Sequence, residues 1–415
     1  MKILHIMPHL GGGVGKALST LVAQFTDKDY CHSFLLLELP EKSQFLDKIR
    51  ELGCEVHVKP NNETVNALVN NTDIVQLEWW NHPATFQFLC THDLPPMRLM
   101  VWCHISGLSV PIIPQKLIKA SRYFLFTSAC SYKAKSIISL DDINKLKLGV
   151  VSSGIGFKYS KTTKFKSQTK LRYGYMGSLN PGKIHPNFIS YLYKVDISGF
   201  KVSIWGDNFY KDVLLDKCRD MSSVELVNFK GYSTNPQITL SSLDVFVYLL
   251  NPVHYGTAEN VLLEAMSLGV VPVVMNNEAE MEIVRHGETG LIVSDENEFS
   301  DAINWLESNP KDREKMSKNA IIDIGKNYST NKMFEDMSSY YERSIKYLKQ
   351  EINFCDAFGN DPYDWYMTCQ KETKIACSKT DDSIRDSCHE ETKGSLKHYL
   401  NYFPNNSRLK ELVKI

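Results

Sequence analysis

The stretch from residue 254 to residue 293 constrains the fold of this chain more than any other part of the sequence. Apolar residues at positions 261, 262, 265, 266 and 268 recur at helical spacing, and Gly269 follows them as a helix stop. The run at 270–274 is too apolar for a strand with one face in water. A helix followed by a buried strand is the repeating unit of a parallel sheet, so the stretch predicts an α/β fold.

The loop before this helix has the features of an anion-binding site. A loop that enters a helix offers backbone N–H groups without helical partners, together with the positive end of the helix dipole, and both favour a phosphate. Glu264 follows inside the helix, where its carboxylate can accept hydrogen bonds from paired hydroxyls such as those of a ribose. The stretch therefore indicates a site for a nucleoside diphosphate.

Strands and helices alternate along the rest of the chain. Apolar runs at 2–7, 73–77, 97–103 and 171–176 are predicted strands, and the glycine-rich residues before a helix at 16–25 are a predicted loop. This order predicts two doubly wound parallel sheets. Ligands of such sheets bind at the carboxyl ends of the strands.

Composition excludes several classes of protein. The formal net charge of −1 argues against a nucleic-acid partner held by bulk electrostatics. No run reaches the roughly 18 apolar residues of a membrane-spanning helix, and the first residues lack a signal-peptide pattern. The 10 cysteines are scattered, and the spacing of the last four is unlike that of common zinc sites. We therefore expect reduced thiols in the cytoplasm and no metal.

The stretch that opens this section resembles the donor-binding segment of one large enzyme family. The matching residues are Glu264-Ala265-Met266, Gly269, Pro272-Val273-Val274 and Glu282-Ile283-Val284. On these residues the chain resembles the retaining glycosyltransferases of glycosyltransferase family 4, the "group 1" family with the GT-B fold. Two positions depart from the family pattern, because Gly256 stands where the family has its first acid and Glu259 stands where it has a small residue.

The resemblance implies a GT-B fold, in which two Rossmann-like domains with doubly wound parallel sheets face a cleft. We expect an acceptor-side domain at 1–165 and a nucleotide-sugar donor domain at 166–330, with the polar stretch at 157–170 as linker. A helix at 331–350 is expected to cross back to the first domain. Residues 351–415 form a C-terminal extension outside the resemblance.

The resemblance also implies which residues hold the donor. A family lysine that clamps the diphosphate is in register with Lys183, whereas the family's arginine is Ser178 here. The expected donor-binding residues are Gly12, Gly13, Ser178, Lys183, Tyr232, Gly256, Thr257, Glu259, Asn260, Val261 and Glu264.

We expect Glu259 to take over part of the work of the missing acid. With a helix start near Thr257, Glu259 falls in the first turn, where the dipole stabilises a negative charge by roughly 0.3–1 kcal/mol. A carboxylate aimed at the diphosphate would repel it. Glu259 is therefore expected to face either solvent or the hydroxyls of the donor sugar.

Polar residues at two strand ends of the first half complete the predicted site. His104 follows a strand and corresponds to a family histidine near the donor sugar and the acceptor, so the expected catalytic residues are His104, Lys183 and Glu259. Glu78, Trp80 and His82 end another strand and are the expected acceptor-binding residues. Trp79 and Trp80 are adjacent, so only one of them can be buried on a given face.

The predicted function is transfer of a sugar from a nucleotide-diphosphate sugar to an acceptor hydroxyl, with retained configuration and without a metal or other cofactor. The expected partners are this donor and a carbohydrate or glycolipid acceptor, with no nucleic acid. The expected location is the cytoplasm, and peripheral contact with the inner face of the membrane is left open. Two alternatives remain: a sugar-nucleotide epimerase or hydrolase of the same fold, and a catalytically weakened GT-B-like binding subunit.

Overall fold

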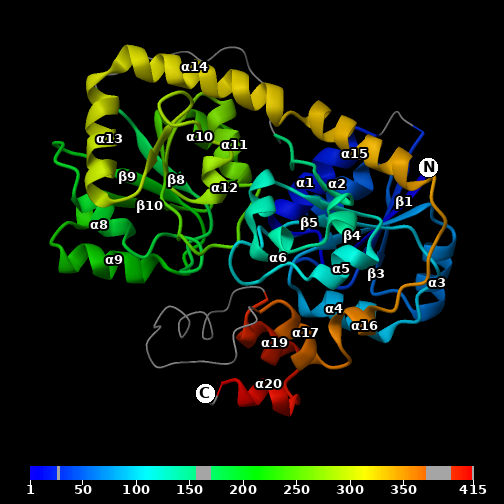
Figure 1. Ribbon diagram of the computed structural model, residues 1–415. Coiled ribbons are helices and arrows are strands. Elements are labelled where there is room, and N and C mark those ends of the chain that lie inside the picture. Colours follow the sequence, from blue (N-terminus) through cyan, green and yellow to red (C-terminus); the bar gives the residue numbers. More distant parts are fainter. Residues whose placement is uncertain (26–28, 156–169, 371–393, 414–415) are drawn as a thin grey trace. The chain divides into compact units, whose positions relative to one another are not determined.

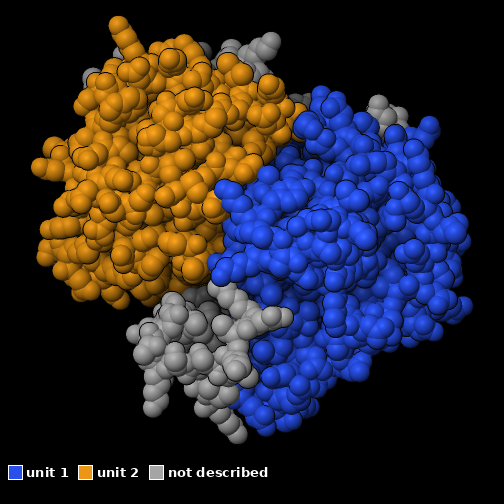
Figure 2. Space-filling view, viewed as in Figure 1, with its two compact units in different colours: residues 1–154, 255–258, 330–415 blue, residues 155–254, 259–329 orange. Residues whose placement is uncertain are grey.

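The computed structural model describes residues 1–25, 29–155, 170–370 and 394–413, which form two compact units (Figure 2). Unit 1 comprises Met1–Gly154, Tyr255–Ala258 and Thr330–Ile415, and unit 2 comprises Ile155–His254 and Glu259–Ser329. The predicted domain boundary at residue 165, almost all of the predicted linker, and Cys377 and Cys388 lie outside the described residues.

Unit 1 is built on a 7-stranded sheet in which every pair of neighbouring strands is parallel. The chain begins at the centre of the sheet, fills one side and then returns to fill the other, which is doubly wound topology. Across the sheet the strands are β3 (Glu55–Val58), β2 (Cys31–Leu36), β1 (Lys2–Met7), β4 (Ile74–Trp79), β5 (Leu99–Cys103), β6 (Tyr123–Phe126) and β7 (Leu148–Val150).

Both faces of this sheet are covered, and each face has its own apolar core. Because successive strand residues point to opposite faces, Leu4 and Ile6 of β1 enter one core while Ile3 and Met7 enter the other. The core around Ile3 is closed by α1 (Gly12–Ala23), α2 (Gln44–Glu51) and α15 (Thr330–Ser344). The core around Leu4 includes side chains of α3 (Asn62–Asn70), α4 (Pro83–Thr91), α5 (Gln115–Ala120) and α6 (Lys135–Ile138). Two more short helices, η1 (Ala129–Lys133) and α7 (Asp142–Lys145), lie between β6 and β7 in sequence.

The residues after α15 complete the second core of unit 1. Helices α16 (Phe354–Phe358), α17 (Pro362–Thr368) and α19 (Leu396–Tyr402) pack on α4, as the orange and red ribbons of Figure 1 show, and α20 (Ser407–Glu411) follows them. Phe358 stacks on the buried Trp79 with ring centroids 5.7 Å apart. Tyr399 is fully buried and donates a hydrogen bond to Asn81 Oδ1 at 3.0 Å. The described residues of the C-terminal extension are therefore an integral part of the unit 1 core.

Unit 2 repeats the doubly wound plan with a 6-stranded parallel sheet around a single core. The strands in order are β10 (Val227–Gly231), β9 (Val202–Trp205), β8 (Tyr173–Met176), β11 (Val245–Tyr248), β12 (Val271–Met275) and β13 (Leu291–Val293). The helices are α8 (Phe188–Tyr193), α9 (Lys211–Asp220), η2 (Val224–Leu226), α10 (Pro236–Ser241), α11 (Asn260–Ser267), α12 (Glu278–Met281), α13 (Glu296–Ser308) and α14 (Pro310–Asn327).

The predicted fold class is confirmed, down to the helix, glycine and buried strand of the opening stretch. Helix α11 ends at Ser267 and is followed by Gly269, whose φ of +78° suits glycine, and every residue of β12 is buried. Within the described ranges, no helix combines the length and the apolar character that crossing a bilayer would require.

Helix α1 starts earlier than the sequence predicts, at Gly12 instead of Lys16. Glycine is tolerated here because the first N–H groups of a helix need no helical partner. The N–H of Gly15 already donates to Gly11 O at 3.1 Å. Gly15 has a packing role as well, since a Cβ there would lie 2.9 Å from the carbonyl carbon of Leu10.

Two alanine substitutions in α1 should therefore have opposite effects on stability. Gly15→Ala should lower the free energy of unfolding by about 1–3 kcal/mol, because the backbone of Leu10 must move. Gly13→Ala, at an exposed position of the same helix, should raise it by about 0.5–1 kcal/mol through helix propensity. Urea unfolding followed by circular dichroism measures both, and equal effects of the two variants would contradict this packing.

Candidate functional site

The predicted site residues gather at the carboxyl ends of strands in each unit, and the two groups are described separately. In unit 2, β8 and β11 are parallel neighbours, so the segments that follow them begin at the same edge of the sheet. The loop after β8 carries Lys183, β11 ends in Tyr248, and Glu259 directly precedes α11. Residues 76 positions apart in sequence therefore meet here.

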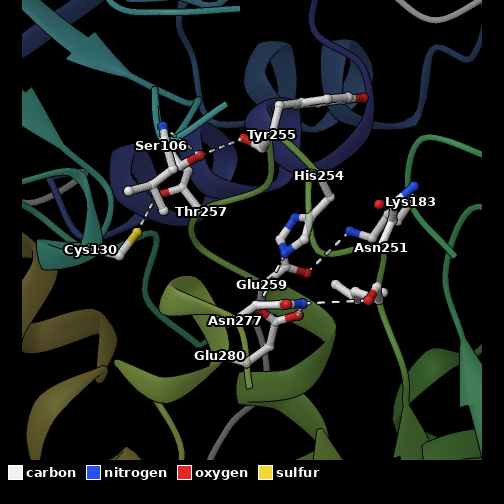
Figure 3. Close-up of polar contacts among 12 residues, drawn as sticks. Ser106, Cys130, Lys183, Asn251, His254, Tyr255, Thr257, Glu259, Asn277 and Glu280 are labelled. Atoms are coloured by element: carbon white, nitrogen blue, oxygen red, sulfur yellow. Dashed lines mark hydrogen bonds and ion pairs between the residues drawn. The ribbon is translucent and has the colours of Figure 1, made fainter. Parts of the chain in front are cut away.

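Glu259 is the centre of the unit 2 group and is only 5% exposed. Its Oε2 accepts a hydrogen bond from Lys183 Nζ at 3.1 Å and another from the Tyr248 hydroxyl. Its Oε1 lies 3.8 Å from His254 Nδ1 (Figure 3). The carboxylate therefore joins three segments of unit 2.

The predicted helix start near Thr257 is wrong, because α11 begins at Asn260 and Glu259 is its N-cap. Glu259 has φ 36° and ψ 53°, a left-handed conformation that cannot continue a right-handed helix. Of the two expected orientations of Glu259, toward solvent or toward the donor sugar, the first is wrong, because its side chain is buried against Lys183 and Tyr248. Its contact with a donor sugar stays a prediction.

The charges around Glu259 compensate for its burial. Burial raises the pKa of the Glu259 carboxyl, but attraction to Lys183 and His254 and the hydrogen bond from Tyr248 outweigh this and lower the pKa. Burial and the neighbouring Glu259 raise the pKa of Tyr248 well above its usual value, so its hydroxyl stays protonated and donates. A buried charge needs such partners, because an unpaired one costs several kcal/mol.

A second carboxylate, Glu280 of α12, holds the far side of His254. His254 Nε2 lies 3.2 Å from Glu280 Oε2, and Asn277 Nδ2 donates to Glu280 Oε1 at 3.2 Å (Figure 3). Burial lowers the pKa of His254, but the hydrogen bond to Glu280 and the charges of both carboxylates raise it overall. Sequence reasoning did not assign roles to His254, Glu280 or Tyr248. The position of Tyr248 at a strand end is the only signal that could have marked it.

The other predicted donor residues of unit 2 lie on the same edge with different exposure. Glu264, one turn into α11, is 4% exposed. Asn260 Oδ1 at the start of α11 and Asn180 Oδ1 in the loop after β8 are buried, and neither has a hydrogen-bond partner among the described residues. Val261 is partly exposed, whereas Ser178 and Tyr232 are exposed. Buried amide oxygens without donors are costly, and they suit the hydroxyl groups of a ligand.

Four predicted donor residues belong to unit 1. Gly12 and Gly13 open α1, and Gly256 and Thr257 lie in the segment Tyr255–Ala258. That segment is tied to unit 1 by the N–H of Ser106, which donates to Tyr255 O at 3.1 Å, and by the Thr257 hydroxyl, which lies 3.8 Å from Cys130 Sγ (Figure 3). Their contacts with a donor stay predictions.

In unit 1, His104 directly follows β5, and its Nε2 lies 2.8 Å from Glu78 Oε2. The sequence groups Glu78 with Trp80 and His82 at the sheet edge, but the structure buries Glu78 completely within β4. Histidines in β1 and directly after β5 form hydrogen bonds with its two oxygens, which makes the burial possible. A contact between Glu78 and an acceptor stays a prediction.

The two tryptophans separate as the strand alternation predicts. Trp79 is fully buried and packs on Phe86, whereas Trp80 is partly exposed and its ring centroid lies 6.2 Å from that of His104. His82 is 1% exposed and caps α4, since its Nδ1 accepts from the N–H of Ala84 at 3.2 Å. Aromatic and histidine side chains thus mark the carboxyl ends of β4 and β5.

Two doubly wound parallel sheets in one chain, each with polar residues at the carboxyl ends of its strands, define the GT-B fold. Residues 160–323 match the family described as "Glycosyl transferases group 1". No curated protein sequence matches the chain.

Solved structures show the same fold at low sequence identity. HepE of Anabaena, crystallised with UDP and glucose, has a TM-score of 0.63 at 15% identity, over 83% of this chain and 100% of that one. A glycosyltransferase of Rickettsia africae has a TM-score of 0.66 at 13% identity, over 84% of this chain and 99% of that one. TarM of S. aureus has a TM-score of 0.68 at 12% identity, over 82% of this chain and 98% of that one.

Two histidines of unit 2 should stabilise the fold at opposite ends of the pH range. The raised pKa of His254 means that its contribution is complete below about pH 6.5 and is lost as pH rises through the folded-state pKa. Burial lowers the pKa of His185, so its contribution is present at higher pH and is lost on acidification. His254→Gln should therefore cost most stability in acid, and His185→Gln most at alkaline pH. Urea unfolding between about pH 5.5 and pH 8.5 tests this, and parallel profiles would contradict it.

Proposed function

We propose that this protein transfers a sugar from a nucleotide-diphosphate sugar to an acceptor hydroxyl, with unit 2 holding the donor. The observation that carries the proposal is the position of the Lys183 ammonium, 3.1 Å from the carboxylate of Glu259, the residue at the N-cap position of α11. A cation beside a helix N-terminus is suited to bind an anion such as a diphosphate. The match of residues 160–323 to group 1 glycosyl transferases supports the same function.

Lys183 can serve both Glu259 and a diphosphate. An ammonium has three N–H donors, and the contact with Glu259 uses one of them. The Lys183 side chain is 29% exposed, so a ligand can reach the ammonium. Negative charge grows on the leaving diphosphate during transfer, and a cation already in place stabilises that charge without reorganisation.

Hydroxyl groups of the donor have acceptors nearby in unit 2. Glu264 is proposed to hold the ribose, and the amide oxygens of Asn180 and Asn260 lack partners that sugar hydroxyls would supply. The HepE structure with UDP and glucose supports uridine nucleotides as the first donors to test. A TarM variant was crystallised with alpha-GlcNAc-glycerol and UDP, which supports a carbohydrate acceptor.

Retention of configuration and independence from metal are proposed on the resemblance to glycosyltransferase family 4. Lys183 and the α11 N-terminus support the second point, because together they offer positive charge to the diphosphate. A binding subunit without turnover is the second candidate. It is favoured by Ser178, an exposed hydroxyl where the family has an arginine, and by the pairing of Lys183 with Glu259.

A panel of sugar nucleotides tests the function directly. UDP-, GDP- and ADP-sugars are screened for a rise in thermal melting temperature and for nucleotide release, with and without a panel of oligosaccharides. Binding with release that depends on an oligosaccharide supports the transferase. Binding without release identifies the binding subunit, release without acceptor indicates a hydrolase, and the absence of any binding overturns the proposal.

Glu264→Ala should weaken binding of the donor found in this screen by about tenfold or more, because a hydrogen bond to a charged group contributes about 1.5–3 kcal/mol. Isothermal titration calorimetry measures the change. The control is Glu225→Ala, which removes an exposed acid of η2 and should leave affinity unchanged. Equal affinity of Glu264→Ala and wild type would remove Glu264 from the donor site.

Lys183→Ala should lower both stability and turnover, and a second substitution separates the two effects. The single variant leaves the buried Glu259 without its cation, which should cost about 3–5 kcal/mol of unfolding free energy. The double variant with Glu259→Gln should recover much of that stability. Its kcat should stay about a hundredfold or more below wild type, because the diphosphate still lacks its cation. Recovery of kcat together with stability would place the clamp elsewhere.

A further inference from the structure

The core of unit 1 holds a carboxylate for which the donor site has no use. Glu78 is completely buried, and its two oxygens meet three nitrogen atoms. Oε2 lies 2.8 Å from His104 Nε2, while Oε1 lies 2.9 Å from His5 Nδ1 and 2.7 Å from Gln76 Nε2. These partners come from β1, β4 and the end of β5, which are neighbours in the sheet.

The protonation states of this network follow from its geometry. Burial raises the pKa of Glu78, but hydrogen bonds with His104 and His5, and the charges these rings can carry, outweigh it and lower the pKa. An ionised carboxylate only accepts hydrogen bonds, so each histidine nitrogen that faces it must carry a proton. His104 is therefore protonated at Nε2, and its Nδ1 carries a lone pair when the ring is neutral.

The far end of the network requires the same arrangement. His32 of β2 has a pKa well below its usual value because of burial first and then the nearby His5, so it is neutral. Its Nε2 is buried without a partner among the described residues, so its single proton belongs on Nδ1. From there it donates to His5 Nε2 at 2.8 Å, which leaves the proton of His5 on Nδ1, facing Glu78.

Tyr341 of α15 supplies the hydrogen bond that orients the Gln76 amide group. Its hydroxyl donates to Gln76 Oε1 at 2.6 Å, so the amide group of Gln76 points toward Glu78. Burial raises the pKa of Tyr341 well above its usual value, which keeps it a donor. One negative charge on Glu78 and three neutral histidines thus satisfy every contact of this network.

We propose that Glu78 is a positioning residue that fixes His104 with its proton on Nε2, so that Nδ1 accepts a hydrogen bond from a hydroxyl of the substrate. No hydrogen bond reaches His104 Nδ1 from the described residues, and the ring is flanked by Trp102 at 4.9 Å and Trp80 at 6.2 Å between centroids. The contact with a substrate hydroxyl rests on the proposed glycosyl transfer. The tautomer of His104 is independent of that function, because it follows from the hydrogen bond with Glu78.

This arrangement selects the kind of group that can meet His104. A lone pair attracts a hydroxyl and repels a carbonyl or carboxylate oxygen, which are themselves acceptors. His104 would therefore favour a sugar hydroxyl at this position.

Nitrogen NMR on the 15N-labelled full chain tests the tautomer without any ligand. His104, assigned by its loss in His104→Gln, should show a protonated Nε2 and an unprotonated Nδ1 near neutral pH. In Glu78→Gln the amide must donate as well as accept, so His104 should gain a population with its proton on Nδ1. Tyr341→Phe, two contacts away, is the control and should leave the His104 tautomer unchanged. A wild-type His104 with its proton on Nδ1 overturns the proposal whether or not Glu78→Gln folds.

Turnover is the second measurement. If Glu78 had only a structural role, its substitution would not lower kcat selectively. With UDP-glucose as probe, Glu78→Gln should lower kcat about tenfold or more while KM for the donor changes little, because the proposed donor contacts of Lys183 and Glu264 are left intact. The loss should be measured relative to Tyr341→Phe, which shares the network. Unchanged kcat in Glu78→Gln with an altered tautomer overturns the substrate contact. Absence of turnover in the wild type counts against the proposed function, and the NMR result still decides the tautomer.

Discussion

Parallel pairing of every strand with its neighbours is the constraint on which the rest of this structure depends. In a parallel sheet all carboxyl ends lie along one edge, so segments that are distant in sequence are delivered to the same place. Glu259 meets Lys183 from 76 positions away, and Glu78 meets His5 from 73 positions away. Neither meeting needs a long loop, because the sheet itself fixes the distance between adjacent strands.

Each unit contains a buried carboxylate whose burial gives little stability by itself. Removing a charge from water costs several kcal/mol, and the attraction of its partners roughly offsets this cost. What such a carboxylate does supply is orientation. Glu259 holds the Lys183 ammonium at the start of α11, and Glu78 holds the His104 ring at the end of β5. In both units a buried carboxylate thus orients a functional side chain, the Lys183 ammonium in unit 2 and the His104 imidazole in unit 1.

The sequence was sufficient for the fold class and for the burial of Trp79, because hydrophobic periodicity and strand alternation are local properties. It could not place the start of α11, since the left-handed backbone of Glu259 occurs together with tertiary contacts to Lys183 and Tyr248. The complete burial of Glu78 could not be predicted from the sequence either. A glutamate in an apolar strand is acceptable only when distant histidines face it, and no local pattern reveals which strands will be neighbours.

The four residues Tyr255–Ala258 have a consequence for how this chain can change in evolution. They belong to unit 1, while the residues on both sides of them belong to unit 2, so neither unit is one continuous stretch of sequence. Recombination that replaced residues 155–329 as a block would bring a foreign segment to Ser106 and Thr127, whose partners are Tyr255 and Thr257. Exchange of donor specificity between relatives must therefore preserve this short insert or replace both units together.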